Sequence, residues 1–169
     1  VVGMLHAMAF PECVKNKAKA YYHLGLIYDE EGNTEQALQH YFKARELDKE
    51  LAPVYTKVGD LFFSKEEYEV AIAFYKTVKH DFKIKPCIKK LIEKNPENPK
   101  IMMRVAEYFS SIELNEKAIK YYQYAQSLAQ DDQMKSEALT AIGHILKKDQ
   151  AKQGDEYIKN AAEHNYFNY

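Results

Sequence analysis

The stretch AKAYYHLGLIYDEEGNTEQALQHYFKARELDKEL, residues 18–51, decides the fold, because its pattern returns after 34 positions, from residue 52 onward. Apolar residues recur in it at the i, i+3, i+4 and i+7 spacing of one helix face, first as far as Tyr28 and again from Ala37. Gly32 and Asn33 stand between these two runs and are typical of a turn. The unit is therefore predicted to be a hairpin of two amphipathic helices.

Later units carry the same residue classes at the same places. In the first unit these positions are Tyr21, Leu24, Gly25, Tyr28, Ala37, Tyr41 and Ala44. In the second they are Tyr55, Val58, Gly59, Phe62, Ala71, Tyr75 and Val78, and in the third Met102, Val105, Ala106, Phe109, Ala118, Tyr122 and Ala125. A weaker fourth unit has Leu139, Ile142, Gly143 and Leu146, and then Gly154, Ile158 and Ala161 if one residue is deleted from the turn.

This pattern resembles the tetratricopeptide repeat (TPR) family at nearly every diagnostic position, although Lys49 replaces the late proline of the family in the first unit. The resemblance implies an all-α TPR α-solenoid of antiparallel helix hairpins in a right-handed superhelix. One hairpin cannot bury its apolar face alone, so neighbouring hairpins stack. The predicted organisation is an N-terminal segment 1–17, interpreted as the remnant of a preceding helix, TPR 1 at 18–51, TPR 2 at 52–80, an extra helix or insert at 81–98, TPR 3 at 99–132, a degenerate TPR 4 at 133–164 and an aromatic tail at 165–169.

The insert is predicted to be one extra, unpaired helix after the second repeat. Its Ile84, Ile88 and Leu91 have the spacing of a second TPR helix. Pro86 is tolerable in the first turn of that helix but not inside one continuous rod, so we expect a break near residues 81–85. We interpret its lysines as a solvated face, and a patch for an acidic partner is the less favoured alternative.

Composition and motifs exclude several functions. Lysine and arginine (24) balance aspartate and glutamate (25), so no net charge favours nucleic acid, and no apolar run is long enough for a membrane span. Cys13 and Cys87 lack any paired spacing and are interpreted as ordinary thiols. Because the chain begins with Val1, we expect a processed product or part of a longer protein. Its compartment is left open, with the cytoplasm slightly favoured.

No enzyme is predicted. The six histidines show no H-x-x-x-H or H-E-x-x-H spacing, and the chain has no nucleophile elbow or glycine-rich phosphate loop. We therefore predict no catalytic residues, no cofactor-binding residues, no metal ligands and no cofactor.

The resemblance assigns a binding groove, since first-helix residues at fixed positions line the concave face of TPR proteins. In this chain those residues are Tyr22, Leu26, Asp29, Thr56, Asp60, Phe63, Met103, Glu107, Ser110, Thr140, His144 and Lys147. The chaperone-associated branch of the family clamps a C-terminal carboxylate with lysine, asparagine and arginine, which are absent from the corresponding positions here. Asp60 and Glu107 would repel a second carboxylate. The predicted partner is a helix or extended segment with apolar anchors and basic character, and not the acidic tail of a chaperone.

These observations predict a non-catalytic protein-interaction scaffold or adaptor within a larger assembly. An assembly or secretion-type chaperone built on a short TPR array is the alternative, a structural subunit is a third possibility, and an enzyme is the least favoured. Terminal repeats need a polar cap, yet the chain starts with VVGMLHAMAF and ends with HNYFNY. We therefore expect removed neighbouring sequence, or ends buried on a partner or on a second copy of the chain.

Overall fold

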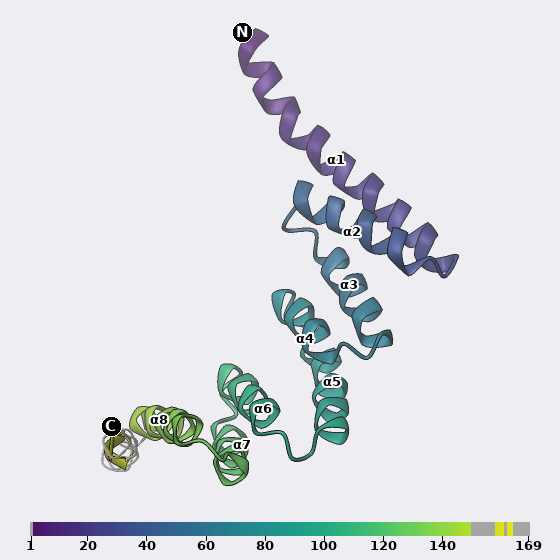
Figure 1. Ribbon diagram of the computed structural model, residues 1–169. Helices are drawn as coiled ribbons and strands as arrows, with labels where there is room; N and C mark the ends of the chain where they lie inside the picture. The colour runs from purple at the N-terminus through teal and green to yellow at the C-terminus, as the bar shows by residue number, and fades with distance from the viewer. Residues whose placement is uncertain (1, 150–157, 161, 164–169) are drawn as a thin grey trace. The chain divides into compact units, whose positions relative to one another are not determined.

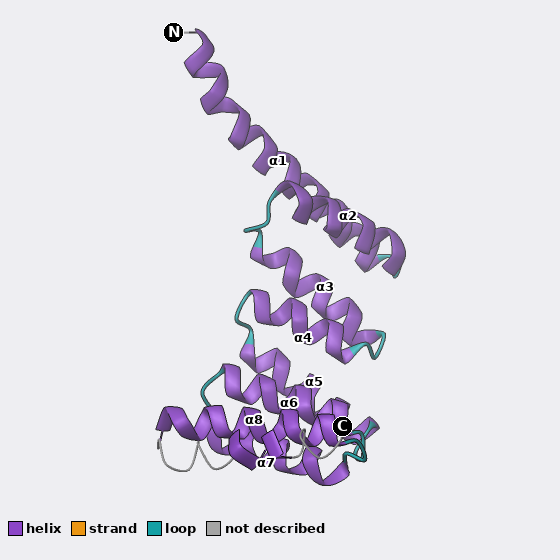
Figure 2. Cartoon of the chain, turned by 60° about the vertical axis from the view of Figure 1, so that its left-hand side comes forward, coloured by secondary structure: helices purple, strands orange, loops and turns teal. Residues whose placement is uncertain are grey.

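The computed structural model describes residues 2–149, 158–160 and 162–163, and every regular element within these ranges is a helix (Figures 1 and 2). The helices are α1 (Val2–Glu30), α2 (Thr34–Leu47), α3 (Ala52–Ser64), α4 (Tyr68–Thr77), α5 (Asp81–Lys94), α6 (Pro99–Ser111), α7 (Asn115–Leu128) and α8 (Asp132–Asp149). Helix α1 packs against α2, α3 against α4, and α6 against α7, so each of the first three predicted repeats forms a hairpin. In addition, α2 packs on α3, and α7 packs on α8.

The chain divides into two compact units, Val1–Lys90 (unit 1) and Leu91–Tyr169 (unit 2). Unit 1 contains the first two hairpins, and unit 2 contains the third hairpin and α8. The boundary between the units lies inside α5.

The three hairpin turns use the same backbone conformation at the same place in the repeat. Gly32, Glu66 and Glu113 have φ angles of 75°, 61° and 59°, which lie in the left-handed region. Glycine reaches this region without strain, whereas glutamate does so at a cost. In the first turn Asn33 then caps α2, because its side chain accepts a hydrogen bond from the backbone N–H of Gln36.

Each unit has a core in which a second helix lies on the first helix of the next repeat. In unit 1 the core consists of Ala37, Tyr41 and Ala44 from α2 and Val54, Val58 and Leu61 from α3. In unit 2 it consists of Ala106, Ala118, Tyr122, Ala138, Ile142 and Ile145. Small residues flank a buried tyrosine on one side, and an aliphatic stripe faces it on the other. Burial of this apolar surface is the main force that holds the stack together.

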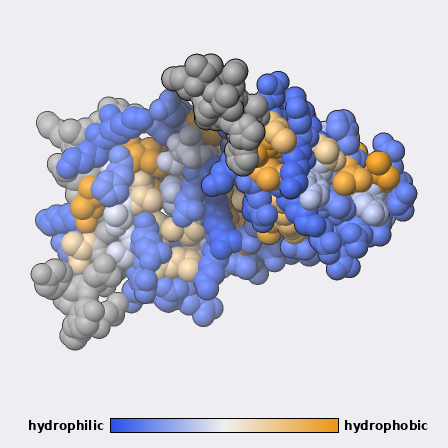
Figure 3. All heavy atoms as spheres, turned by 90° about the horizontal axis from the view of Figure 1, so that it is seen from above, coloured by the Kyte–Doolittle hydropathy of each residue, from blue (hydrophilic) through white to orange (hydrophobic). Residues whose placement is uncertain are grey.

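The surface reflects the amphipathic character of the helices. On the face seen in Figure 3, hydrophilic residues predominate, and hydrophobic residues show in smaller groups between them. An amphipathic helix turns its apolar side toward its neighbours and its polar side toward solvent.

Two features differ from the sequence-based expectation. Segment 1–17 was expected to be separate from the first repeat, but residues 2–17 continue into it as one helix, α1. Pro11 lies inside α1, where it removes one hydrogen bond without ending the helix. Pro86 was expected in the first turn of its helix, yet α5 begins at Asp81 and Pro86 lies in its second turn. The predicted tail 165–169, together with Gly154 and Ala161 of the fourth repeat, lies outside the described residues.

Candidate protein-binding groove

A tyrosine in the second helix of the second repeat links three helices of unit 1. The ring of Tyr75 lies over Gly59, so close that a Cβ on Gly59 would be 2.5 Å from Cε1 of the ring. The Tyr75 hydroxyl donates a hydrogen bond of 2.6 Å to Oδ1 of Asp60. Lys83 of α5 forms an ion pair of 2.6 Å with the same oxygen. Asp60 is thus held from α4 and from α5.

The first repeat contains a looser version of this arrangement. The ring of Tyr41 covers Gly25, where a Cβ would lie 2.4 Å from Cε1 of the ring. The Tyr41 hydroxyl lies 3.4 Å from Oδ2 of Asp29, and Nζ of Lys57, on α3, lies 3.5 Å from the same oxygen. Burial, with the nearby carboxylate as a further cause, raises the pKa of both Tyr41 and Tyr75 far above the ordinary tyrosine value.

These contacts change the electrostatics expected of the groove. Asp29 and Asp60 are predicted groove residues, and Asp60 was expected to repel an acidic ligand. In the structure each carboxylate faces a lysine of the chain itself, Lys57 or Lys83. An ion pair with an internal partner offers little net charge to a ligand. The groove of unit 1 is therefore closer to neutral than the sequence indicated.

A pocket of about 320 Å³ opens in unit 1 where the first two repeats meet. Its lining residues are Tyr22, Ala52, Pro53, Thr56, Lys57 and His80. Tyr22 and Thr56 are predicted groove residues from two successive first helices, and the structure brings them to one pocket. Part of the lining is polar, and Oγ1 of Thr56 lies 3.3 Å from Nδ1 of His80. A pocket of this size is large enough for one bulky side chain of a partner.

Two other predicted residues of unit 1 are used in packing. Leu26 is half-buried and packs against the core of the unit. Phe63 is half-buried and meets Tyr68 in an edge-to-face contact, with 5.3 Å between the ring centroids. Neither residue lines the pocket. Their side chains are therefore engaged mainly with the chain itself.

In unit 2 the predicted groove residues come from α6 and α8. Met103 is half-buried against the core, while Ser110 and Thr140 are half-buried, and Glu107, His144 and Lys147 are exposed. Burial raises the pKa of Tyr122, and the charge of Glu107 raises it further. Glu107 and Tyr122 thus repeat the arrangement of Asp60 and Tyr75, in which a carboxylate of the first helix lies near a tyrosine of the second helix.

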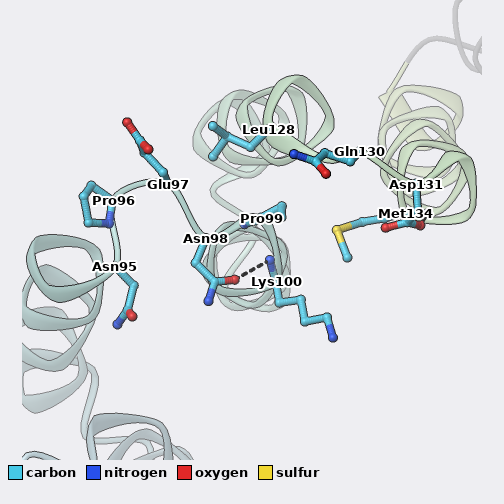
Figure 4. A pocket seen from close by; sticks show the side chains of 10 residues that line it. All are labelled: Asn95, Pro96, Glu97, Asn98, Pro99, Lys100, Leu128, Gln130, Asp131 and Met134. Atoms are coloured by element: carbon cyan, nitrogen blue, oxygen red, sulfur yellow. Dashed lines mark hydrogen bonds between the residues drawn. The ribbon is translucent and has the colours of Figure 1, made fainter.

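A larger hollow of about 770 Å³ lies elsewhere in unit 2, at the loops that connect its helices (Figure 4). It is lined by Asn95, Pro96, Glu97, Asn98, Pro99, Lys100, Leu128, Gln130, Asp131 and Met134. Two of these residues cap helices: Asn98 accepts from the backbone N–H of Lys100, and Asp131 accepts from that of Met134. The hollow contains none of the predicted groove residues.

Sequence reasoning missed Lys57 and His80 in the pocket of unit 1. Lys57 directly follows the predicted groove position Thr56, so its place beside the groove could have been read from the helix period. His80 lies between α4 and α5, and no periodic signal marks a loop residue. The loop hollow of unit 2 had no signal either, because its lining depends on how two loops approach each other.

Other kinds of site find no support in the described part of the chain. It holds no group of three or more histidine, cysteine, aspartate or glutamate side chains placed to bind a metal. Among the described helices, none combines the length and the apolar character needed to cross a membrane. Cys13 is exposed, and burial raises the pKa of the Cys87 thiol to about 11, which keeps it protonated near neutral pH.

Comparison with known proteins agrees with the repeat assignment. Residues 18–51 match the family model described as "Tetratricopeptide repeat". Among solved structures, the "Crystal structure of MamA protein" has a TM-score of 0.50 and 16% identity, over 89% of this chain and 92% of that chain. MamA from Desulfovibrio magneticus RS-1 has a TM-score of 0.45 and 17% identity, over 90% of this chain and 78% of that chain. Yeast Tom70 has a TM-score of 0.43 and 21% identity, over 88% of this chain and 28% of that chain. No curated protein sequence matches significantly.

The chain therefore contains a tetratricopeptide repeat and has the all-α fold of a TPR solenoid, as its residue pattern predicted. TPR modules are in general non-catalytic and bind protein partners. At 16% identity the structural similarity establishes the fold alone.

Proposed function

We propose that the protein is a non-catalytic interaction scaffold that binds a segment of a partner protein on the inner face of unit 1. The observation that carries this proposal is the pocket that joins Tyr22 of the first repeat to Thr56 of the second. These two residues occupy positions that line the ligand groove in TPR proteins, and the pocket is large enough for one anchoring side chain.

The chemistry of the pocket favours an apolar or aromatic anchor. The Tyr22 ring and Pro53 supply apolar surface, and Thr56 and His80 supply polar atoms at one side. The ammonium group of Lys57 is held near Asp29. Recognition here thus depends mainly on the anchor, and basic residues of the partner contribute less than the sequence suggested. An acidic chaperone tail remains disfavoured, because the positions that carry the clamp residues in the chaperone-associated branch hold no lysine, asparagine or arginine in this chain.

Capture of a partner from the native source with the intact chain and with a Thr56→Arg variant tests this function. The arginine fills the pocket without removing a core side chain, so we expect the partner to be lost while the thermal unfolding temperature is maintained. Ala73→Arg is the matched control, since Ala73 is exposed on α4 and outside the pocket. Equal capture by all three proteins would place the binding surface elsewhere.

Synthetic peptides test the character of the partner. An amphipathic peptide with aromatic anchors and lysines, the same peptide with the lysines replaced by glutamine, and a peptide with an acidic C-terminal tail are compared by fluorescence anisotropy. The first two should bind with similar affinity and more tightly than the third. A preference for the acidic tail would contradict the proposed chemistry.

A further inference from the structure

Helix α5 has an exposed side that combines an aromatic side chain with lysines. Phe82, Lys85 and Lys89 follow one another at the i, i+3 and i+7 spacing of one helix face. All three are exposed, Phe82 to 66%. Ile84 and Ile88 lie on the opposite side of the helix and are buried. The exposed side, formed by Phe82, Lys85 and Lys89, is named the basic face.

His80 supports Phe82 in its exposed position. The centroids of the two rings lie 5.4 Å apart, with 35° between the ring planes. His80 is itself fixed, because its Nδ1 lies 3.3 Å from Oγ1 of Thr56 and its backbone carbonyl accepts hydrogen bonds from the N–H groups of Lys83 and Ile84. An aromatic side chain supported in this way loses little conformational freedom when a ligand covers it. The basic face therefore presents a preordered apolar anchor, which a row of solvated lysines does not require.

Positive charge predominates in the segment that contains the basic face. Residues 76–94 contain seven lysines and only two carboxylates, Asp81 and Glu93. One of these lysines, Lys83, is paired with Asp60 of α3. The chain as a whole has a formal net charge of −1, so the excess of lysine is local. A ligand small enough to cover only this surface meets its positive charge, whereas a membrane or a nucleic acid also faces the acidic residues of the rest of the chain.

We propose that the basic face binds an acidic segment of a partner protein in which an apolar side chain stands between carboxylates. The carboxylates pair with Lys85 and Lys89, and the apolar side chain covers Phe82. None of these three residues lines the pocket of unit 1, so the basic face is a second binding surface. The segment is recognised through its side chains, in contrast to the clamp on a C-terminal carboxylate that the sequence disfavours.

A labelled peptide in which two leucines are flanked by glutamates, with both ends chemically blocked, serves as the probe. Blocking removes the terminal carboxylate, so only side chains can be recognised. Fluorescence anisotropy at about 0.15 M salt should show saturable binding to the intact chain. The same peptide with glutamine in place of glutamate should not bind. The double variant Lys85→Glu/Lys89→Glu should weaken binding of the glutamate peptide about tenfold or more, and Phe82→Ser should weaken it about fivefold.

Lys15→Glu/Lys19→Glu is the matched control, because these two lysines of α1 are also exposed, have the same i, i+4 spacing and give the same change in net charge. This control should bind the glutamate peptide as the parent chain does, and all variants should keep the thermal unfolding temperature of the parent. Absence of binding by the glutamate peptide, or equal weakening by the two double variants, would overturn the proposal. Sedimentation with phosphatidylserine vesicles completes the test. Vesicle binding that depends on Lys85 and Lys89, without binding of the peptide, would assign the basic face to a membrane and would also overturn the proposal.

Discussion

Gly59 lies directly beneath the ring of Tyr75, and the space between them holds no methyl group. A Cβ on Gly59 would be 2.5 Å from Cε1 and 2.8 Å from Cδ1 of the ring. Tyr75 is 2% exposed, so its ring has little room to move away. The close approach of α3 and α4 therefore depends on glycine at this position.

Gly59→Ala should destabilise unit 1, although alanine is the better helix former. Overpacking costs about 1–3 kcal/mol, whereas the gain in helix propensity is only about 1 kcal/mol. Urea unfolding followed by circular dichroism measures the net loss. The double variant Gly59→Ala/Tyr75→Leu separates the two effects, because without the ring the alanine should no longer be harmful. An increase in stability for Gly59→Ala alone would show that the ring can move.

The buried tyrosines predict loss of stability at alkaline pH. The pKa values of Tyr41, Tyr75 and Tyr122 are raised above the ordinary value of 10.0 for tyrosine, so the protonated form is favoured in the folded chain. Their contribution is fully present below about pH 10 and is lost as the pH rises above it, by about 1.4 kcal/mol per pH unit for each tyrosine that ionises only on unfolding.

Tyr75→Phe should make this decline less steep, since one ionising group is removed. Free energies of unfolding measured from about pH 8 to about pH 11.5 give the slope, and the absorbance of tyrosinate follows ionisation in the folded state. Tyr124→Phe is the control, because the Tyr124 side chain is 43% exposed and lies outside the buried core. Equal slopes for the parent chain and Tyr75→Phe would mean that Tyr75 ionises without unfolding.

The sequence predicted the hairpins and their cores well, for a physical reason. Glycine or alanine opposite tyrosine, at helical spacing, is a local pattern that leaves few ways to pack two helices. The sequence placed Gly25 and Tyr41, and likewise Gly59 and Tyr75, at corresponding diagnostic positions of two successive repeats, and the structure shows that both pairs are in contact.

The sequence could not predict which charged side chains of the groove are paired. Whether Asp60 is paired depends on Lys83, a residue of the next helix but one, whose long side chain has to reach back across the stack. The continuous helix α1 was also missed, because the boundary after residue 17 was placed from the 34-residue period, which marks where a repeat begins and not where a helix begins. Both the ion pair and the full length of the helix depend on the folded chain, and the periodicity of the sequence does not reveal them.

The pair of Asp60 and Lys83 should contribute measurably to stability, unlike a fully solvated pair. A double-mutant cycle with Asp60→Ala and Lys83→Ala should give a coupling energy of up to about 1 kcal/mol that decreases with added salt. The control cycle uses Glu113 and Lys148, which lie 3.2 Å apart but have side chains 80% and 71% exposed. Its coupling should be near zero. A coupling of the same size in both cycles would contradict the importance of partial burial.

The left-handed residue of the hairpin turns predicts opposite effects of two substitutions. Gly32 has a φ of 75°, and no atom lies within 4 Å of the position that a Cβ would occupy, so Gly32→Ala should cost about 1 kcal/mol through the backbone alone. Glu113, with a φ of 59°, should gain a similar amount on replacement by glycine, since its ion pair with Lys148 is exposed. Thermal unfolding of the two variants measures these changes. A loss of stability for Glu113→Gly would show that its side chain does more than this structure indicates.

Pro86 should destabilise α5 where it stands, and its removal should make the chain more stable. It lies in the second turn of the helix, where a backbone N–H would donate to the carbonyl of Phe82, and proline has no such N–H. Because Pro86 is exposed, little packing is lost when its ring is removed. Pro86→Ala should therefore raise the free energy of unfolding by about 1–3 kcal/mol. Pro99 is the matched control, because it occupies the first turn of α6, where the N–H would have no helical partner. Pro99→Ala should change stability by no more than about 0.5 kcal/mol. Hydrogen exchange of the backbone amides of α5 locates the effect, and protection from exchange should increase in this helix for Pro86→Ala. A gain in stability without added protection in α5 would assign the change to the unfolded chain, because proline also restricts the conformational freedom of that state.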